Sequence, residues 1–307
     1  MTNKDSGKKN TQIIPLYFTL SVIAILGLTG ILCFTQSGFW KNLRIRHMSQ
    51  ILTDNKYIIH ACGKVSGDDG QKYTYTNSIE ALKRMYRKGN RVVEVDFAFT
   101  TDDEIACVHE WSQSCYTNTA DKKNASLEGR PLSLNEFRSV RINGYFTPML
   151  LEDVLSFMKK HDDLILITDI KESRNEDGSS GDELKRLCAR IMDTAPELKD
   201  RIIIQIYSED EYDMVRETGF DYIIYTLYNL PAEQKLDTDR HLEFAQSHPL
   251  VAITFQRILL MDEKFMSSME KSEIPLLVHT VDGKKYKKAV LSGGTISAIY
   301  TNDVKNG

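Results

Sequence analysis

Short apolar runs alternate with amphipathic helical patterns from Lys56 to the end of the chain. Alternation of this kind over about 250 residues is typical of a parallel sheet covered by helices, and the number of strands fits a (β/α)8 barrel of the TIM type. We therefore expect residues 56–307 to form one α/β barrel domain. The predicted strands are 57–62, 91–97, 104–109, 164–170, 202–207, 221–226, 250–255, 275–281 and 296–300. The predicted helices are 78–88, 149–160, 182–193, 210–218, 238–246, 262–271 and 283–291.

The connection between the second and third predicted strands departs from this alternation. Only six residues separate Phe97 from Glu104, too few for a parallel crossover that contains a helix. Either the two strands form a local hairpin or one of them lies outside the barrel, which would also explain nine candidates for eight positions. Residues 110–148 are rich in Ser, Asn, Lys and Gly, so we expect a long irregular insertion there, of the kind that is usually functional.

The N-terminal part contains an apolar segment over residues 13–34, and no charged residue lies between Lys9 and Lys41. Its 22 mostly apolar residues are enough to span a bilayer as a helix. A cleaved signal peptide is the alternative, but the run is long and no small-residue cleavage site follows it cleanly. A lipoprotein signal fits poorly because Leu32 precedes Cys33 where a small residue would be expected.

We therefore expect an N-terminal tail over 1–12, a single transmembrane anchor over 13–34 and a short juxtamembrane helix within 35–55. Phe39 and Trp40 are typical of a membrane interface. Positive charges flank the apolar segment almost equally, but long C-terminal parts are translocated regardless of such charge. We expect a cell-membrane protein whose main domain is extracytoplasmic.

The overall charge and the cysteines exclude two kinds of partner. A net charge of −4 provides no basic surface for nucleic acid. Five cysteines without a CxxC spacing indicate neither a zinc site nor a disulfide framework. Cys107 and Cys115 could pair in an oxidising compartment, but buried free thiols are the favoured interpretation.

The apolar strand 91–97 carries two carboxylates, Glu94 and Asp96. Alternate residues of a strand share a face, so these two side chains point the same way, roughly 7 Å apart. Between the covered faces of a parallel sheet, such a pair would force one group to take a proton unless a cation lies between them. The strand therefore favours a metal site, although an exposed edge strand with two charges would also fit.

Other chemically unusual residues follow further predicted strands, and active sites of parallel barrels lie at the carboxyl ends of strands. His60 follows the first strand, His109 ends the third, and Asp169 and Lys171 end the fourth on a shared face. Three carboxylates suit a hard cation such as Mg²⁺ or Ca²⁺ rather than zinc. The set fits metal-assisted phosphoryl transfer, with the cation and Lys171 stabilising phosphate charge and the two histidines acting as general acid and base.

Each of these residues also has a structural interpretation of its own, such as an ordinary ion pair for Asp169 and Lys171. Asn77 followed by Glu80 predicts a capping box that opens the helix 78–88. His279, in the strand 275–281, is a weaker candidate for the barrel mouth. The occurrence of several unusual strand ends together is what favours a functional site.

Taken in order, these motifs resemble the glycerophosphodiester phosphodiesterases, part of the phosphatidylinositol phospholipase C-like superfamily of TIM barrels. The resemblance is densest from Tyr57 to Trp111 and continues more weakly to Asp303. The motifs are His60-Ala61-Cys62-Gly63, Thr76 to Ala81, Glu94-Val95-Asp96, Val108-His109-Glu110, Asp169-Ile170-Lys171 and Ile299 to Asp303.

The resemblance implies a role for each matching residue. His60 and His109 correspond to acid/base histidines and Lys171 to a phosphate-binding lysine. Glu94, Asp96 and Asp169 correspond to metal ligands. The implied reaction cleaves a phosphodiester of glycerol, in which a neighbouring substrate hydroxyl attacks phosphorus and water then opens the cyclic intermediate.

The chain departs from the family pattern at several positions. Ala61 replaces an arginine that would contact phosphate, Asp169 replaces a longer Glu, and Thr76 and Glu110 replace other family residues. We expect metal-dependent hydrolysis of a glycerophosphodiester or of a related small-molecule, lipid-derived or polymer-derived diester. Two alternatives stay open: lyase-type cleavage to a cyclic phosphate, and a non-catalytic barrel that binds a phosphorylated ligand at the cell surface.

Overall fold

The computed structural model describes residues 38–111, 116–118, 130–170, 182–228 and 237–303. By its contacts the chain divides into residues 1–44 and 45–307, and the barrel lies wholly in the second unit. In the first unit, the described residues 38–44 are helical and expose Phe39 and Trp40. The predicted transmembrane segment lies outside the described residues. Among the helices that are described, none combines the length and apolar character needed to cross a membrane.

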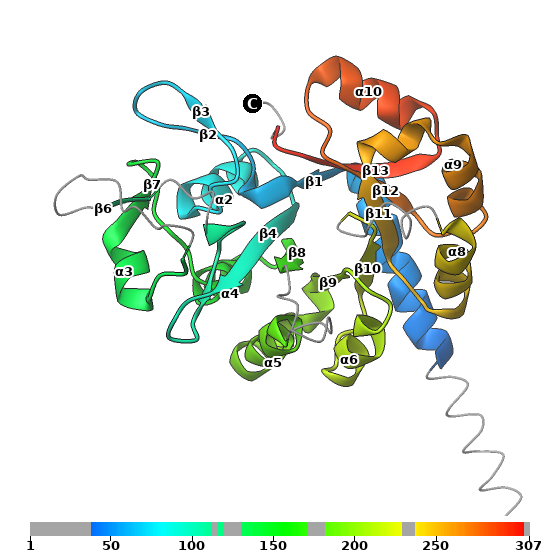
Figure 1. Ribbon diagram of the computed structural model, residues 1–307, viewed down its shortest axis with the longest axis horizontal. Coiled ribbons are helices and arrows are strands. Elements are labelled where there is room, and N and C mark those ends of the chain that lie inside the picture. The colour runs from blue at the N-terminus through cyan, green and yellow to red at the C-terminus, as the bar shows by residue number, and fades with distance from the viewer. Residues whose placement is uncertain (1–37, 112–115, 119–129, 171–181, 229–236, 304–307) are drawn as a thin grey trace, which may run out of the picture. The chain divides into compact units, whose positions relative to one another are not determined.

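Eight parallel strands close into a TIM-type barrel, as the alternating pattern predicts (Figure 1). Closure is complete because β1 pairs in parallel with both β13 and β4. Around the barrel the strands follow their order in the chain. The barrel strands are β1 (Tyr57–Ile59), β4 (Val92–Phe99), β8 (Ile165–Ile170), β9 (Ile202–Ile206), β10 (Ile223–Thr226), β11 (Ala252–Gln256), β12 (Leu276–His279) and β13 (Ile296–Thr301).

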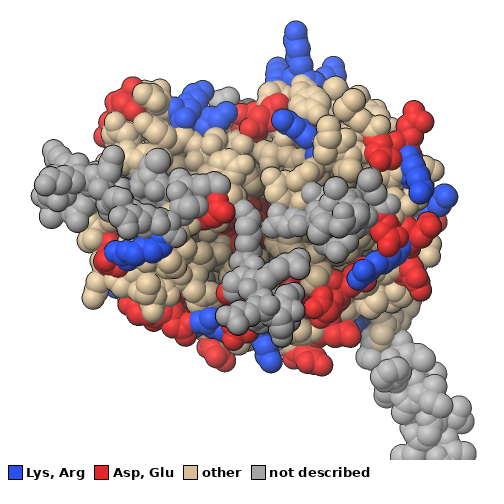
Figure 2. All heavy atoms as spheres, viewed as in Figure 1, with Lys and Arg blue, Asp and Glu red and all other residues tan. Residues whose placement is uncertain are grey.

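Helices cover the outside of the barrel, and every predicted helix is present within two residues at either end. Each forms because apolar residues recur three or four positions apart, as Ala81, Leu82 and Met85 do on α2. The helices are α2 (Ile79–Arg87), α4 (Leu151–Lys160), α5 (Glu183–Thr194), α6 (Glu211–Glu217), α8 (Thr238–Ser247), α9 (Glu263–Glu270) and α10 (Lys284–Ser292). Lysines are frequent on α10, and basic side chains gather over it in Figure 2.

The ninth strand candidate forms a hairpin rather than a barrel strand. The short β5 (Ile105–Ala106) pairs antiparallel with the end of β4, which confirms one of the two expectations for this connection. The insertion that follows is more regular than expected, because it contains β6 (Tyr116–Asn118), α3 (Leu134–Ser139) and β7 (Val140–Ile142). Within the described part of the insertion, α3 is held in place because its Phe137 is buried in the main hydrophobic core.

The amino end of the barrel is closed by the helical residues 45–55. Ile45, Met48 and Leu52 on one face of this segment join the apolar cluster formed by inward-facing strand residues such as Val92. Ser49 Oγ donates a hydrogen bond to the Val251 carbonyl, which immediately precedes β11 (2.6 Å). This end of the barrel is therefore apolar and filled, which leaves the carboxyl end for polar chemistry.

Candidate active site at the carboxyl ends of the strands

Strand register places Glu94, Asp96 and Asp169 inside the barrel. Val92 and Ile167 belong to the interior cluster, and residues two positions away on the same strand share their face. The pairing of β4 with β8 sets Asp96 directly beside Asp169. β4 also has barrel neighbours on both edges, so the alternative of an exposed edge strand is wrong.

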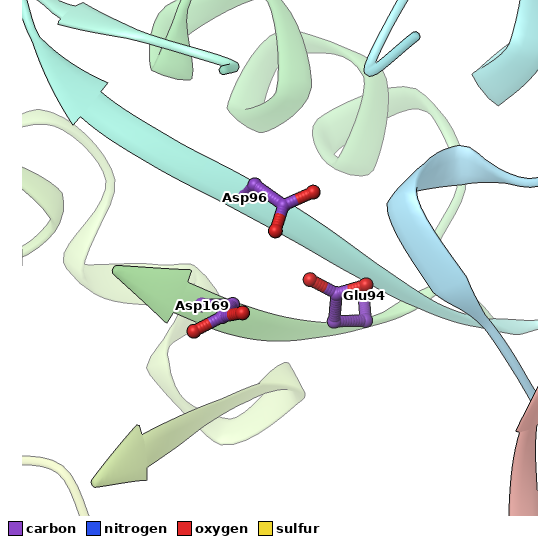
Figure 3. Close-up of side chains that lie close together, drawn as sticks. All are labelled: Glu94, Asp96 and Asp169. Atoms are coloured by element: carbon purple, nitrogen blue, oxygen red, sulfur yellow. The ribbon is translucent and has the colours of Figure 1, made fainter. Parts of the chain in front are cut away.

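The three carboxylates turn toward a common space (Figure 3). One oxygen from each lies within 4.8 Å of the others, and all three side chains are buried. Buried carboxylates this close repel one another strongly unless positive charge is added. Oxygen ligands bind Mg²⁺ or Ca²⁺ at about 2.0–2.6 Å, so two ligands of one ion can be roughly 4–5 Å apart. The predicted metal residues therefore come together in a geometry that suits a divalent cation.

Each carboxylate is held by a neighbouring donor. Glu94 Oε2 accepts the backbone N–H of Ala61 (2.7 Å). Asp96 Oδ2 accepts the Asn77 amide (2.8 Å), and Asp169 Oδ1 accepts the hydroxyl of Tyr207. Such outer partners fix the orientation of metal ligands and are part of a working site.

The predicted capping box at Asn77 is wrong. Asn77 adopts a left-handed conformation (φ 43°), and its side chain is used on Asp96 instead. Ser78 caps α2, with its Oγ accepting the Ala81 N–H (3.3 Å). The carboxylate of Glu80 accepts two hydrogen bonds from Thr147, one from the Thr147 backbone N–H (2.9 Å) and one from the Thr147 hydroxyl (2.7 Å). Asn77 is thus a site residue that the helix-start pattern concealed.

His60 lies immediately after β1, in a turn where Ala61, Cys62 and Gly63 all have positive φ. This left-handed turn points the Ala61 N–H at Glu94 and keeps His60 beside it, with Nε2 3.9 Å from Glu94 Oε2. Left-handed conformations of non-glycine residues are sparsely populated and cluster at functional sites. The Ala61 side chain is fully buried, so the position contributes its backbone to the site.

Asn302 and Asp282 determine which ring nitrogen of His60 carries the proton in the neutral imidazole. Asp282 Oδ2 accepts the Asn302 amide nitrogen (2.8 Å), which directs Oδ1 of Asn302 toward His60 Nδ1 (3.1 Å). Because that oxygen can only accept, Nδ1 of His60 carries the proton. In the neutral imidazole the lone pair is then on Nε2, the nitrogen that faces the carboxylates. Both residues follow late strands; Asn302 lies in the Ile299–Asp303 motif, which gave it no role, and Asp282 gave no local signal in the sequence.

Tyr75 connects the two predicted acid/base histidines. Its ring makes edge contacts with His60 and His109, at centroid distances of 4.7 and 5.0 Å. Burial is the main cause that raises the pKa of Tyr75 to about 12, so the hydroxyl stays protonated. His109 was expected at the end of a strand, and it follows the hairpin strand β5, which is not part of the barrel. It nevertheless lines the same cavity as His60 and Tyr75.

His279 also faces this space, as the weaker prediction had it. Its ring stacks on Tyr300 at a centroid distance of 3.6 Å and meets His60 edge-on at 5.9 Å. Burial, and then the neighbouring His60, lower the pKa of His279 well below its usual 6.5, so the imidazole is neutral. A cavity of about 30 Å³ lies between these side chains. It is lined by His60, Tyr75, His109, Asp169, Gln205, Tyr207, Tyr228, His279 and Thr280.

Tyr207 and Gln205 link Asp169 to the far wall of the barrel. Burial, and then the charge of Asp169, raise the pKa of Tyr207 well above 10, which keeps its hydroxyl a donor to that carboxylate. Gln205 donates to the same hydroxyl (3.4 Å) and accepts the hydroxyl of Tyr300 (3.1 Å). Lys171 lies outside the described residues, so its role remains a prediction.

Comparison with known proteins identifies similar chains. A family model described as the glycerophosphoryl diester phosphodiesterase family matches residues 69–306. Curated protein sequences give no significant match. A glycerophosphodiester phosphodiesterase from Thermotoga maritima is 17% identical with a TM-score of 0.55, covering 81% of this chain and 95% of that chain. One from Parabacteroides distasonis is 16% identical with a TM-score of 0.57, covering 80% and 92%.

A third solved structure is an Oleispira antarctica phosphodiesterase in complex with the product sn-glycerol-3-phosphate. It is 13% identical to this chain with a TM-score of 0.57, covering 81% of this chain and 94% of that chain. At such low identities the structural likeness establishes the shared barrel fold. The match to the family model extends over most of the chain.

Proposed function

Because the chain belongs to the glycerophosphoryl diester phosphodiesterase family, we propose that it hydrolyses a glycerophosphodiester, or a related lipid-derived or polymer-derived diester, with the help of a divalent cation. Membership of this family makes it a phosphoric diester hydrolase. The observation that carries the proposed mechanism is the group of three buried carboxylates with His60 beside it.

The carboxylates would hold the cation, for which Mg²⁺ and Ca²⁺ are the candidates on the chemistry of the donor set. When bound, the ion would supply a Lewis acid for a phosphoryl oxygen. The Ala61 N–H, the Asn77 amide and the Tyr207 hydroxyl hold the carboxylates in place for it.

We assign the proton transfers to His60 and His109. A substrate hydroxyl next to the diester attacks phosphorus, and its proton passes to Nε2 of His60, whose Nδ1 proton is held by Asn302. The P–O bond to the leaving alcohol breaks as His109 protonates that oxygen. Water then opens the cyclic phosphate, with His109 accepting the proton of the water and His60 returning one to the hydroxyl.

Lys171 completes the proposed site as a phosphate contact. Its support is the Asp169-Ile170-Lys171 motif in the sequence. Ala61 offers no side-chain charge, since it is buried and holds Glu94 through its backbone. The positive charge that stabilises the transition state would therefore come from the cation and Lys171.

Turnover of several glycerophosphodiesters, assayed with and without Mg²⁺ or Ca²⁺, tests this function. We expect His60→Ala and His109→Ala each to abolish hydrolysis while circular dichroism shows an intact fold. Full activity in both variants, or after thorough chelation, would overturn the mechanism. Phosphorus NMR of the products separates hydrolysis from release of a cyclic phosphate. Calorimetric binding without turnover would instead favour a non-catalytic barrel, the alternative suggested by Ala61.

We also propose that residues 13–34 form a single membrane span with the barrel on the extracytoplasmic side. The support is the apolar run of 22 residues with no charge between Lys9 and Lys41. The full-length chain should stay with membranes through an alkaline wash, and protease added to intact cells should digest the barrel. Release of the chain by the wash would contradict the membrane anchor, and complete protection of the barrel from protease would contradict the extracytoplasmic orientation.

A further inference from the structure

A second, larger cavity adjoins the proposed catalytic cavity and has no role in the mechanism above. Its volume is about 430 Å³, within the usual range for small-molecule sites. Tyr75, Tyr228 and His279 line both cavities, so one ligand could extend from the first into the second. A diester has two substituents on phosphorus, and the larger cavity is placed to receive one of them. The inference therefore rests on the proposed function.

His279 provides a polar contact at the junction of the two cavities. Its side chain is more than nine-tenths buried, and within the described part of the chain its Nε2 has no hydrogen-bond partner. A buried polar atom of this kind is costly unless a ligand or water satisfies it. A hydroxyl or phosphoryl oxygen of a bound substrate would do so.

One charged group on the wall of the larger cavity, Arg257, can bind an anionic substituent. Arg257, at the start of η4 (Arg257–Met261), lines this cavity, and its guanidinium makes no hydrogen bond or ion pair with the described residues. Asp282 also lines it, but its carboxylate already accepts three hydrogen bonds, from the hydroxyl of Thr301 and from the backbone and side chain of Asn302. These neutral donors occupy the Asp282 oxygens but leave its charge in place, so the charged group of this wall that is open to a ligand is the Arg257 guanidinium.

We propose that the larger cavity binds the alcohol substituent of the diester, and that Arg257 selects a substituent carrying a second anionic group. His279 contacts the substrate where the two cavities meet. A phosphate on the alcohol has this chemistry, and so does the next unit of a glycerol phosphate polymer. The site thus favours a diester with negative charge on both sides of the leaving oxygen.

Two matched substrates test the selection: glycerophosphoglycerol, and the same compound phosphorylated on its terminal hydroxyl. The full-length enzyme should have a kcat/KM up to about fivefold higher for the phosphorylated compound, since Arg257 is exposed and an exposed ion pair contributes up to about that factor. Arg257→Gln should remove this preference by lowering kcat/KM for the phosphorylated compound more than for glycerophosphoglycerol. Arg87→Gln, at an exposed position of α2 outside the cavity, is the matched control and should change neither kcat/KM.

An equal preference for the two compounds in the unmodified enzyme would overturn the proposal, as would better turnover of glycerophosphocholine, whose substituent is cationic. An equal loss on both compounds in Arg257→Gln would also overturn it. His279→Phe, which keeps an aromatic ring on Tyr300, should raise KM more than it lowers kcat, and His279→Gln should partly restore KM. An unchanged KM in both variants would contradict the proposed contact between His279 and the substrate.

Affinity can be measured separately from catalysis. Calorimetry on His60→Ala with each compound should give tighter binding of the phosphorylated one, lost in the His60→Ala/Arg257→Gln double variant. That result would support the cavity even if the hydrolytic function failed, and equal affinities would reject it even if hydrolysis occurred. Competition by poly(glycerol phosphate) at equal repeat concentration would identify the polymer as the source of the second anion. Competition by the small phosphorylated compound alone would identify a free metabolite.

Discussion

At the scale of single residues, the amide of Asn302 decides which nitrogen of His60 holds the proton. It can do so because Asp282 fixes the amide in one orientation. We expect Asn302→Leu to lower kcat by about 10²-fold, the usual effect of losing a general base in the correct protonation state, with little change in KM. Steady-state kinetics on glycerophosphoglycerol would measure both.

The pair offers its own control. In the double variant Asp282→Asn/Asn302→Asp the amide and the carboxylate exchange places, and both hydrogen bonds can form again. This exchange should recover much of the activity that Asn302→Leu loses. No recovery, with normal folding by circular dichroism, would mean that the two residues do not act on His60 through this contact.

His279 predicts how stability depends on pH. Its pKa in the folded chain is well below 6.5, because of burial and then His60, while an unfolded histidine titrates near 6.5. Between these two values the unfolded state binds more protons, so the free energy of unfolding rises with pH. Between about pH 7 and pH 5 the unmodified chain should lose more stability than His279→Phe, by at most about 1.4 kcal/mol per pH unit. Urea unfolding at several pH values would show this, and parallel pH profiles would contradict it.

At the scale of elements, the helical residues 45–55 stabilise the barrel without contributing to the site. Leu52 is fully buried against the interior cluster. We expect Leu52→Ala to cost about 2–5 kcal/mol in the free energy of unfolding, with kcat/KM unchanged while the chain is folded. Urea unfolding and activity assays on the same samples would test both parts. Leu43→Ala, at an exposed position of the same helix, should stay within about 0.5 kcal/mol.

The elements themselves were largely predictable because their signals are local. The period of the apolar residues shows α2 and α5 directly, and the short Phe97–Glu104 connection indicates the β4–β5 hairpin. The helix and strands in the described part of the insertion were not predictable. They depend on Phe137 reaching a core built from distant parts of the chain, which no local composition reveals.

The site divides in the same way. Glu94, Asp96 and Asp169 could be predicted because carboxylates within apolar strands are unusual in themselves. Tyr75 and Asp282 lie outside the regular elements, where such residues are ordinary. Asn77 and Asn302 fall within the quoted motifs, but the motifs gave neither of them a role. Their roles come from left-handed backbone and from contacts across the barrel, such as the one that joins His60 to Asn302.

At the scale of the whole molecule, the carboxylate group couples ion binding to stability. Three buried carboxylates within 4.8 Å disfavour the ion-free fold, and an ion that binds only the folded chain adds about 2.7 kcal/mol at a hundredfold excess over Kd. Mg²⁺ or Ca²⁺ should therefore raise the midpoint of thermal unfolding by about 5 °C, and EDTA should reverse this. Asp96→Asn should abolish the increment, and Asp193→Asn, exposed on α5, should retain it. Equal increments in both variants would contradict the metal site.

The closed amino end of the barrel has a consequence for how substrate enters and products leave the site. The described helix residues Ile45, Met48 and Leu52, together with the inward-facing strand residues, fill the passage along the barrel axis. Substrate and products must then share one doorway at the carboxyl end. A glycerol phosphate product that is still bound at this opening would exclude the next substrate, so we expect products to be competitive inhibitors. A polymeric substrate would have to bind and leave at this same end, because it cannot pass along the barrel axis.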